Sequence, residues 1–389
     1  MLWSTSRPDF EYAAPMQSPR RDFTVTTIYE RQLLVVGGQD DKGRVLDSWE
    51  VFDAESKTFT ARGTLPYSLM DHAAVFREGY PDNSVIIVGG WDGAKASDSI
   101  FIMEPHTWRV TEGPKLRFPR RRPAIIELCE GILIAGGADC ECGCEFYNPE
   151  TGKLDYWDGP VGTLKGAAFL PGPKGTLLLT GGLDSSGRVS DRTFIIDIHS
   201  KTCRPGPPLQ TARYGHYAMG VNWPLPLLLG GIGPNGKPLS TTEYYDEAKG
   251  AFANGPSLLW PITEISADVY FAVPPPETSM SHDLWGLILI GGERGKPSAR
   301  TQAMYPAKSP VFHTGPTLQK ARCGAQVGWL HVGFDDICVV LGGATRDAPA
   351  TATVEYINTR RYLARRNRLI NVWLRTWDSL KTWLRLPDW

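Results

Sequence analysis

The chain has 389 residues, of which 42% are hydrophobic and 21% are charged, and its formal net charge is -1. It has no apolar run long enough to cross a bilayer, so no transmembrane helix is expected. The 41 glycines and 31 prolines are spread without a low-complexity tract, which indicates an all-β chain with many tight turns rather than a disordered one.

Residues 1–21 lack the apolar core and the small-residue cleavage site of a secretory signal. The seven cysteines are an odd number, and the chain has no Asn-x-Ser/Thr acceptor. Both features favour a reducing compartment. We therefore expect an intracellular protein, cytoplasmic or organelle-associated, that is not secreted.

From residue 33 onward, a short aliphatic run ending in two glycines recurs seven times, from LLVVGG to CVVLGG. The mean spacing of the copies is about 51 residues, a period found in repeat proteins. Short runs rich in β-branched residues and bounded by turn formers predict strands buried on both faces. The first glycines of the doublets are Gly37, Gly89, Gly136, Gly181, Gly230, Gly291 and Gly342.

Each doublet is followed by a loop, a half-buried strand such as 48–53 and an outer segment such as 59–65. Only six outer segments follow the seven doublets. The seventh lies at the other end of the chain, where residues 10–20 (FEYAAPMQSPR) repeat the order of residue types in residues 312–322 (FHTGPTLQKAR). We expect this N-terminal strand to pair with the last repeat and close a ring, because closure removes exposed sheet edges.

These residues resemble the kelch repeat: aliphatic-Gly-Gly, a Glu-x-Tyr-like strand, an aromatic residue, then Arg-x-Gly-His. The resemblance covers roughly residues 8–360. It implies a seven-bladed β-propeller with the architecture of the galactose oxidase central domain, each blade a four-stranded antiparallel sheet around a central channel. The sequence departs from the pattern at the aromatic position (Leu154, Cys203) and at the arginine position near Leu69, Leu164 and Thr263.

The arginines of the repeat fall at equivalent positions, so a closed ring brings them toward one annular face. One reading is structural pairing with carboxylates of the blades. The other is recognition of an acidic peptide or loop by this propeller face, with Arg21, Arg121, Arg122 and Lys165 close by in sequence. The residues concerned are Arg20, Arg120, Arg213 and Arg322.

His72 and His216 occupy the histidine position of the repeat. We expect a ring nitrogen of each to bond backbone between blades, with general acid-base work as the alternative. No catalytic residues and no cofactor are predicted. The rival function is a kelch-type enzyme, such as a carbohydrate oxidase, lyase or isomerase, acting at the channel mouth.

Two local patterns suggest other chemistry. Residues 231–237 (GIGPNGK) match a Gly-x-Gly-x-x-Gly phosphate-binding pattern, but Pro238 stands where Ser or Thr is needed, and the next residues read as a strand. We expect a turn there. Cys140, Cys142 and Cys144 are the densest group of soft ligands; a reduced surface loop is the main reading, with metal binding or redox exchange as alternatives.

Residues 361–389 form a different kind of segment, since the glycines end and residues 360–389 carry a net charge of +6. Apolar residues at helical spacing predict an amphipathic helix. Three readings stay open: folding back on the propeller, docking on a partner protein or complex, and lying on an anionic membrane surface. The anchor residues are Leu369, Trp373, Trp377, Leu380 and Leu384, with the basic residues Arg366 and Arg375.

The sequence therefore predicts two parts: a kelch propeller over residues 1–360, in which residues 8–20 close the last blade, and a basic C-terminal helix over 361–389. The predicted function is a non-catalytic interaction scaffold that the helix attaches to a larger protein complex or a membrane surface. Nucleic acid is an unlikely partner because the remainder of the chain is acidic.

Overall fold

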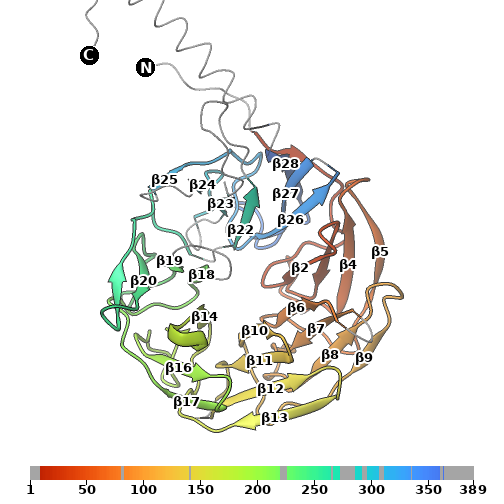
Figure 1. Cartoon of the computed structure of the whole chain (residues 1–389). Coiled ribbons are helices and arrows are strands. Elements are labelled where there is room, and N and C mark those ends of the chain that lie inside the picture. Colours follow the sequence, from red (N-terminus) through yellow and green to blue (C-terminus); the bar gives the residue numbers. More distant parts are fainter. Residues whose placement is uncertain are drawn as a thin grey trace, which may run out of the picture.

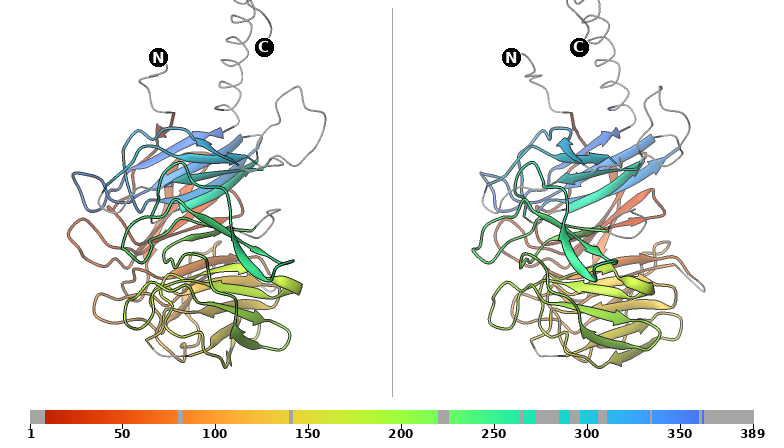
Figure 2. Two further views of the ribbon diagram at one scale, coloured as in Figure 1. Left: turned by 90° about the vertical axis from the view of Figure 1, so that its left-hand side faces the viewer. Right: turned by 60° about the vertical axis from the view of Figure 1, so that its left-hand side comes forward.

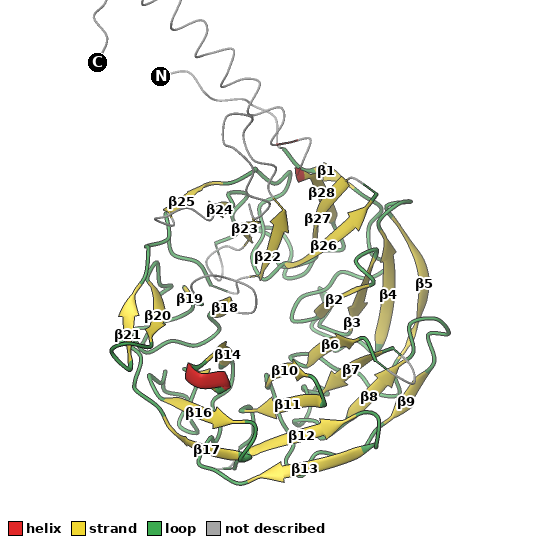
Figure 3. Cartoon of the chain, in the orientation of Figure 1, coloured by secondary structure: helices red, strands yellow, loops and turns green. Residues whose placement is uncertain are grey.

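The computed structural model describes residues 9–79, 83–139, 142–219, 226–263, 266–271, 285–290, 296–305, 311–333, 335–359 and 362. These residues form seven four-stranded antiparallel sheets (Figure 1). Strands make up nearly all of the regular structure, and one short 3-10 turn lies at Pro173–Gly175 (Figure 3). The all-β fold predicted from the repeat is confirmed.

The sheets follow one another in chain order, and within each sheet the strands run from the inner to the outer edge. The first three sheets are β2 (Thr24–Ile28), β3 (Gln32–Val36), β4 (Ser48–Asp53) and β5 (Thr58–Thr64); β6 (Ala73–Arg77), β7 (Ser84–Val88), β8 (Ile100–Met103) and β9 (Val110–Glu112); and β10 (Ala124–Leu128), β11 (Gly131–Ala135), β12 (Cys144–Asn148) and β13 (Lys153–Trp157).

The next three are β14 (Ala168–Pro171), β15 (Leu177–Thr180), β16 (Thr193–Asp197) and β17 (Thr202–Pro205); β18 (Tyr217–Met219), β19 (Leu227–Leu229), β20 (Thr242–Asp246) and β21 (Ala251–Asn254); and β22 (Ser266–Phe271), β23 (Trp285–Ile290), β24 (Gln302–Tyr305) and β25 (Val311–Thr314). The seventh sheet is β26 (Gln326–Val332), β27 (Asp335–Leu341), β28 (Val354–Asn358) and β1 (Glu11–Tyr12).

The sheets are arranged as a ring around a common centre (Figure 1). The inner strands of neighbouring sheets contact each other in the series β22, β26, β2, β6, β10, β14 and β18, so β26 of the seventh sheet contacts β2 of the first. Each sheet packs its faces against the sheets beside it, so the core consists of several apolar clusters between sheets. This arrangement is a β-propeller.

The predicted aliphatic runs form the second strand of each sheet, and this strand is covered on both faces in the six sheets whose side-chain burial is described. In β3, the side chains from Leu33 to Val36 are fully buried. The doublet that follows has positive φ angles of 59° at Gly37 and 96° at Gly38. A Cβ atom on Gly37 would lie 2.2 Å from the carbonyl oxygen of Leu69. Glycine is therefore required on both counts, because it tolerates this backbone conformation and lets the next sheet's connection approach.

The N-terminal strand completes the seventh sheet, since β1 pairs with β28 through Glu11↔Tyr356 and Tyr12↔Glu355. In both side views of Figure 2, the red N-terminal strand lies against the blue last sheet. Phe10 is fully buried in the apolar cluster of that sheet. Its carbonyl oxygen accepts a hydrogen bond of 2.6 Å from the side chain of Gln319.

We predict that Phe10→Ala lowers the free energy of unfolding by about 3–4 kcal/mol, because it empties a buried aromatic site. The matched control is Tyr12→Ala, two residues further along the same segment, where the side chain is 57% exposed. That change should stay within about 0.5 kcal/mol. Chemical denaturation of the full chain measures both values, and equal stability of the two variants would contradict a closing role for this segment.

Candidate functional site

One face of the ring carries the glycine doublets and the connections from each sheet to the next. In an antiparallel meander, successive connections alternate between the two ends of the strands, so the loops after the second strands and the connections between sheets share one end. We call this end the junction face. The hairpin turns between first and second strands, such as residues 29–31, lie on the opposite face.

The four repeat arginines lie beneath the junction face rather than on it, with exposures of 0–1%. Each guanidinium group forms an ion pair with a buried glutamate on the third strand of the same sheet. The N–O distances are 2.7, 2.8 and 2.6 Å in the first three of these pairs. The pairs are Arg20–Glu50, Arg120–Glu145, Arg213–Glu243 and Arg322–Glu355.

This burial corrects one prediction of the sequence. Arg20, Arg120, Arg213 and Arg322 expose no surface that a partner could contact. The alternative reading, pairing with carboxylates of the sheets, describes them instead. Burial lowers the pKa of Arg20, Arg213 and Arg322, and the paired glutamate opposes this shift.

Each pair also ties three segments of backbone together, as the fifth sheet illustrates. Arg213 donates to the carbonyl oxygens of Gly230 (2.9 Å) and Thr241 (3.1 Å). Glu243 accepts hydrogen bonds from the backbone N–H groups of Gln210 (2.8 Å) and Thr211 (3.0 Å). The ion pair thus holds the incoming connection against the doublet and the third strand, and its polar atoms are satisfied despite burial.

In the three sheets without the arginine, the glutamate is also replaced. The strand register identifies the residue that replaces the glutamate. In every sheet compared, the glutamate or its replacement on the third strand lies opposite the residue two positions before the glycine doublet. The second and fourth sheets have apolar pairs, and the sixth pairs an apolar residue with an uncharged polar one, Gln302, which still accepts from the backbone N–H of Leu259 (2.6 Å). These pairs are Leu69 with Phe101, Leu164 with Phe194, and Ile262 with Gln302.

The residue two positions after each arginine site forms a collar around the inner edge of the junction face. Backbone hydrogen bonds join the collar from sheet to sheet: Asp71 N–H to Asp22 O (3.0 Å), Arg122 N–H to Asp71 O (2.8 Å) and Gly166 N–H to Arg122 O (3.2 Å). All described members have positive φ angles, from 53° to 69°. The collar residues are Asp22, Asp71, Arg122, Gly166, Gly215 and Gly324.

Three successive collar residues are charged where the repeat pattern has glycine. Side chains rarely adopt this backbone conformation, and an observed departure of this kind points toward function. Asp71 accepts from Arg122 Nε (2.6 Å) and from Arg121 Nη2 (2.6 Å), and Arg122 also reaches Asp22 at 3.3 Å. Arg121 stacks on the ring of Trp91, 4.7 Å from its centroid. Sequence reasoning missed Asp22 and Asp71, although their departure from glycine was readable.

His72 and His216 lie beside the collar and link neighbouring sheets. Nε2 of His72 shares a hydrogen bond with the hydroxyl of Thr24 (2.8 Å), and Nε2 of His216 does so with Thr180 (3.0 Å). The partners are thus side-chain hydroxyls rather than the backbone groups that were expected. Burial lowers the pKa of His72 to about 4 and that of His216 to about 3. Both rings are therefore neutral at neutral pH and serve a structural role.

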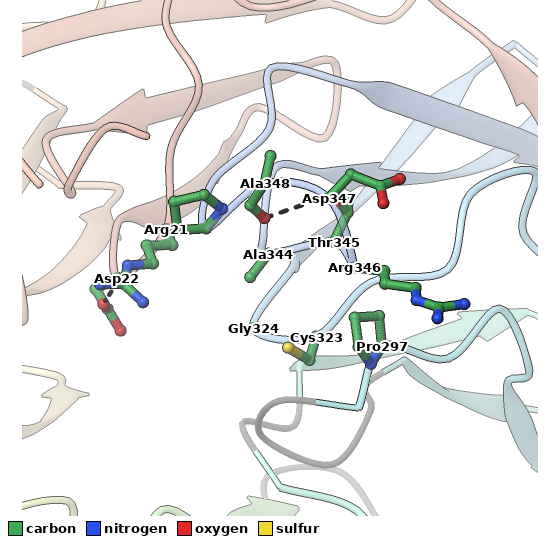
Figure 4. Close-up of a pocket in the computed structure, with 11 residues that line it drawn as sticks. Arg21, Asp22, Pro297, Cys323, Gly324, Ala344, Thr345, Arg346, Asp347 and Ala348 are labelled. Carbon is green, nitrogen blue, oxygen red and sulfur yellow. Dashed lines mark hydrogen bonds and ion pairs between the residues drawn. The ribbon is translucent and has the colours of Figure 1, made fainter. Parts of the chain in front are cut away.

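A pocket of about 530 Å³ opens at the collar between the first, sixth and seventh sheets (Figure 4). Its walls are mostly small residues, and charged side chains stand at two sides: Arg21 and Asp22 from the first sheet, Arg346 and Asp347 from the loop between β27 and β28. Arg346 and Asp347 are exposed. The remaining lining residues are Pro297, Cys323, Gly324, Ala344, Thr345, Ala348 and Pro349.

The other predicted sites have simple outcomes. Residues 231–237 form a turn that leads into strand β20, so the phosphate-loop pattern is not followed by a helix. Cys142 and Cys144 are buried, which corrects the expectation of a surface loop for these two. Within the described residues, no three His, Cys, Asp or Glu side chains are placed to hold a metal ion. Cys140 lies outside the described residues.

The C-terminal anchor residues, Leu369, Trp373, Trp377, Leu380 and Leu384 with Arg366 and Arg375, also lie outside the described residues. In the part of the chain that is described, no helix has the length and apolar character needed to span a bilayer.

The repeat pattern and the ring of four-stranded sheets identify the chain as a kelch-repeat β-propeller. It is similar to beta-scruin of Limulus polyphemus (28% identity over 174 residues, 43% of this chain) and to alpha-scruin of the same species (29% over 159 residues, 39% of this chain). It also matches the acyl-CoA-binding domain-containing protein 5 of Arabidopsis thaliana (28% over 123 residues, 30% of this chain).

These alignments cover 18%, 17% and 18% of the three relatives, so the chain matches only a minor part of each. No family model matches the chain.

The buried pairs generate a stability prediction. Arg213→Ile should cost about 3–5 kcal/mol, because Glu243 is left buried without its cation. Glu243→Gln should be costly for the converse reason. The double variant reproduces the Ile–Gln pair of the sixth sheet, and we expect a favourable coupling of about 2 kcal/mol between the two changes. Denaturant unfolding of the four proteins measures this coupling; strictly additive costs would contradict a pair that is exchanged as a unit.

Proposed function

We propose that the protein is a non-catalytic interaction scaffold: a seven-bladed kelch propeller over residues 1–360 that binds an acidic peptide or loop at its junction face. The observation that carries this proposal is the pocket at the collar, because Arg21 and Arg346 flank it from opposite sides. The proposed ligand is still an acidic segment, as the sequence predicted. The arginines proposed to bind it are Arg21 and Arg346 rather than the four buried ones.

The charges around the collar support an acidic ligand. Arg121 and Arg122 are engaged by Asp71, and Lys165 is engaged by Asp139 at 2.5 Å. Arg21 instead donates to the neutral amide oxygen of Gln39 (2.6 Å), and its contact with Asp22 is longer, at 3.7 Å. Arg346 forms no ion pair with the described residues. These two guanidinium groups are therefore the ones best able to bind a new carboxylate, which their fork of donors suits.

The pocket walls suit a peptide rather than a large rigid group. Ala344, Ala348 and Gly324 have little side-chain volume, so a main chain or a short acidic side chain can approach the loop backbone closely. The pocket volume is within the range of small-ligand sites, about 300–1,000 Å³. One Asp or Glu of the partner would occupy it, and neighbouring residues would lie along the collar.

Charge reversal tests this proposal. The double variant Arg21→Glu/Arg346→Glu should weaken binding of fluorescent Asp- and Glu-rich peptides by about tenfold or more, equivalent to about 1.4 kcal/mol. Arg31→Glu is the matched control, since Arg31 is 63% exposed and lies on the opposite face. Fluorescence polarisation at two salt concentrations measures the affinities. Equal weakening by both variants would indicate a non-specific charge effect and would overturn the assignment of the pocket.

We further propose that residues 361–389 form the helix that attaches the propeller to a partner complex or to an anionic membrane surface. The support is the apolar stripe Leu369, Trp373, Trp377, Leu380 and Leu384, together with the net charge of +6 over residues 360–389. Tryptophan side chains are unfavourable in water, so a covering surface stabilises such a helix. Each basic residue near an anionic surface contributes about 1 kcal/mol to attachment.

Replacing Trp373, Trp377 and Leu380 with Ser should release the protein from the particulate or complex fraction of its cell without changing the unfolding of the propeller. Asn371→Ser/Thr382→Ser is the control, because these positions fall on the other side of the predicted helix. Gentle native fractionation followed by size measurement reads out the result. Retained association of the triple variant would overturn the anchor, and vesicle flotation separates lipid from protein attachment.

A further inference from the structure

Two cysteines from neighbouring sheets lie side by side. Cys144 begins β12 of the third sheet and Cys203 belongs to β17 at the outer edge of the fourth sheet. Their Sγ atoms are 3.5 Å apart, although 59 residues separate them in the chain, and both are free thiols. A disulfide bond is about 2.0 Å long, so the two sulfurs would have to approach by about 1.5 Å to form one.

The packing explains why these two strands approach so closely. Cys144 is fully buried in the apolar cluster between the third and fourth sheets, beside Phe146 and Trp157. Gly159, which follows β13, packs directly against Cys203; a Cβ atom added to Gly159 would lie 2.5 Å from the Cβ of Cys203. Glycine at this position therefore lets the outer strand of the fourth sheet reach the third.

The two thiols differ in exposure and in acidity. Cys203 is half-buried on an outer strand, while its neighbours Thr202 and Arg204 are exposed, so a small oxidant can reach it. The hydrogen bond from Cys144 lowers the pKa of Cys203, whereas that same bond, with burial, raises the pKa of Cys144. The accessible sulfur is thus the more reactive one, because the thiolate is the nucleophile.

We propose that Cys144 and Cys203 are a redox modification site that forms a reversible disulfide between the third and fourth sheets. With a hydroperoxide as oxidant, the Cys203 thiolate attacks the peroxide oxygen, the O–O bond breaks, and the leaving oxygen takes up a proton. The Cys144 sulfur then attacks the sulfenic sulfur of Cys203. The S–O bond breaks, hydroxide leaves with the proton of Cys144 as water, and a dithiol reductant reverses the bond.

The disulfide would affect the junction face through residues that are adjacent to Cys144 in the chain and through their ion-pair partner. Cys144 precedes Glu145, the partner of the buried Arg120, and Arg120 leads directly into Arg121 and Arg122 of the collar region. Oxidation would therefore fix the third strand that positions this ion pair to the adjacent sheet. This inference does not rest on the proposed function, because the disulfide forms or fails to form whether or not the pocket binds a peptide.

The test is peroxide titration of the full-length protein, followed by non-reducing peptide mapping. We expect a cross-linked pair of peptides containing Cys144 and Cys203, with a mass lower by about 2 Da for the two hydrogens lost. Fragmentation assigns the bridge to Cys144 rather than to its neighbours in sequence. The melting temperature should rise by several degrees on oxidation, because the bridge closes a long loop, and should return to its starting value with dithiothreitol.

Cys203→Ser should abolish both the cross-link and the melting shift, whereas Cys129→Ser, which removes an exposed cysteine elsewhere in the third sheet, should retain them. Because Cys203 is only half-buried, its replacement leaves the core intact. Three outcomes would overturn the proposal: a bridge between other cysteines, irreversible over-oxidation of Cys203 without a bridge, or an unchanged mass at oxidant concentrations that modify Cys129.

Discussion

The ring depends on one constraint: the segment that connects one sheet to the next must pass close to the end of a second strand. Two glycines with positive φ provide the space, and the connection from the neighbouring sheet lies against them. In four sheets, a buried arginine then donates to the first glycine's carbonyl oxygen while pairing with a glutamate. Sheet spacing, collar and pocket all follow from this arrangement, because the collar residues come two positions after the arginine site.

The buried pairs show how a repeat protein can change its interior without changing its fold. A lone charge in this position would be severely destabilising, whereas a complete ion pair, an apolar pair, or an apolar residue with an uncharged polar one can each satisfy the site. The chain contains all three solutions at register-equivalent positions. The pairing of Leu69 with Phe101 and of Leu164 with Phe194 explains why those sheets remain regular despite the missing arginine.

The fold was largely predictable from the sequence, but the site was only partly so. The aliphatic-Gly-Gly runs have a periodicity that indicates the second strands directly, and residues 10–20 have the residue order of an outer segment. Whether a repeated arginine is buried depends on the residue with which it pairs on the third strand. A single sequence does not show which third-strand residue faces the arginine. The pocket between Arg21 and Arg346 joins segments more than 300 residues apart, so only the closed ring brings them together.

The pairing of β1 with β28 also determines the order in which the protein can be completed during synthesis. Glu11 lies beside Tyr356, and the hydroxyl of Tyr356 donates to the Glu11 carboxylate across 345 residues of chain. The first six sheets are built from consecutive strands and can form as the chain emerges. The N-terminal segment, in contrast, has no sheet to join until the last strand is made. Phe10 packs in the apolar cluster of the seventh sheet and stays uncovered until that sheet is made, so a segment that precedes all seven sheets in the chain is among the last to fold.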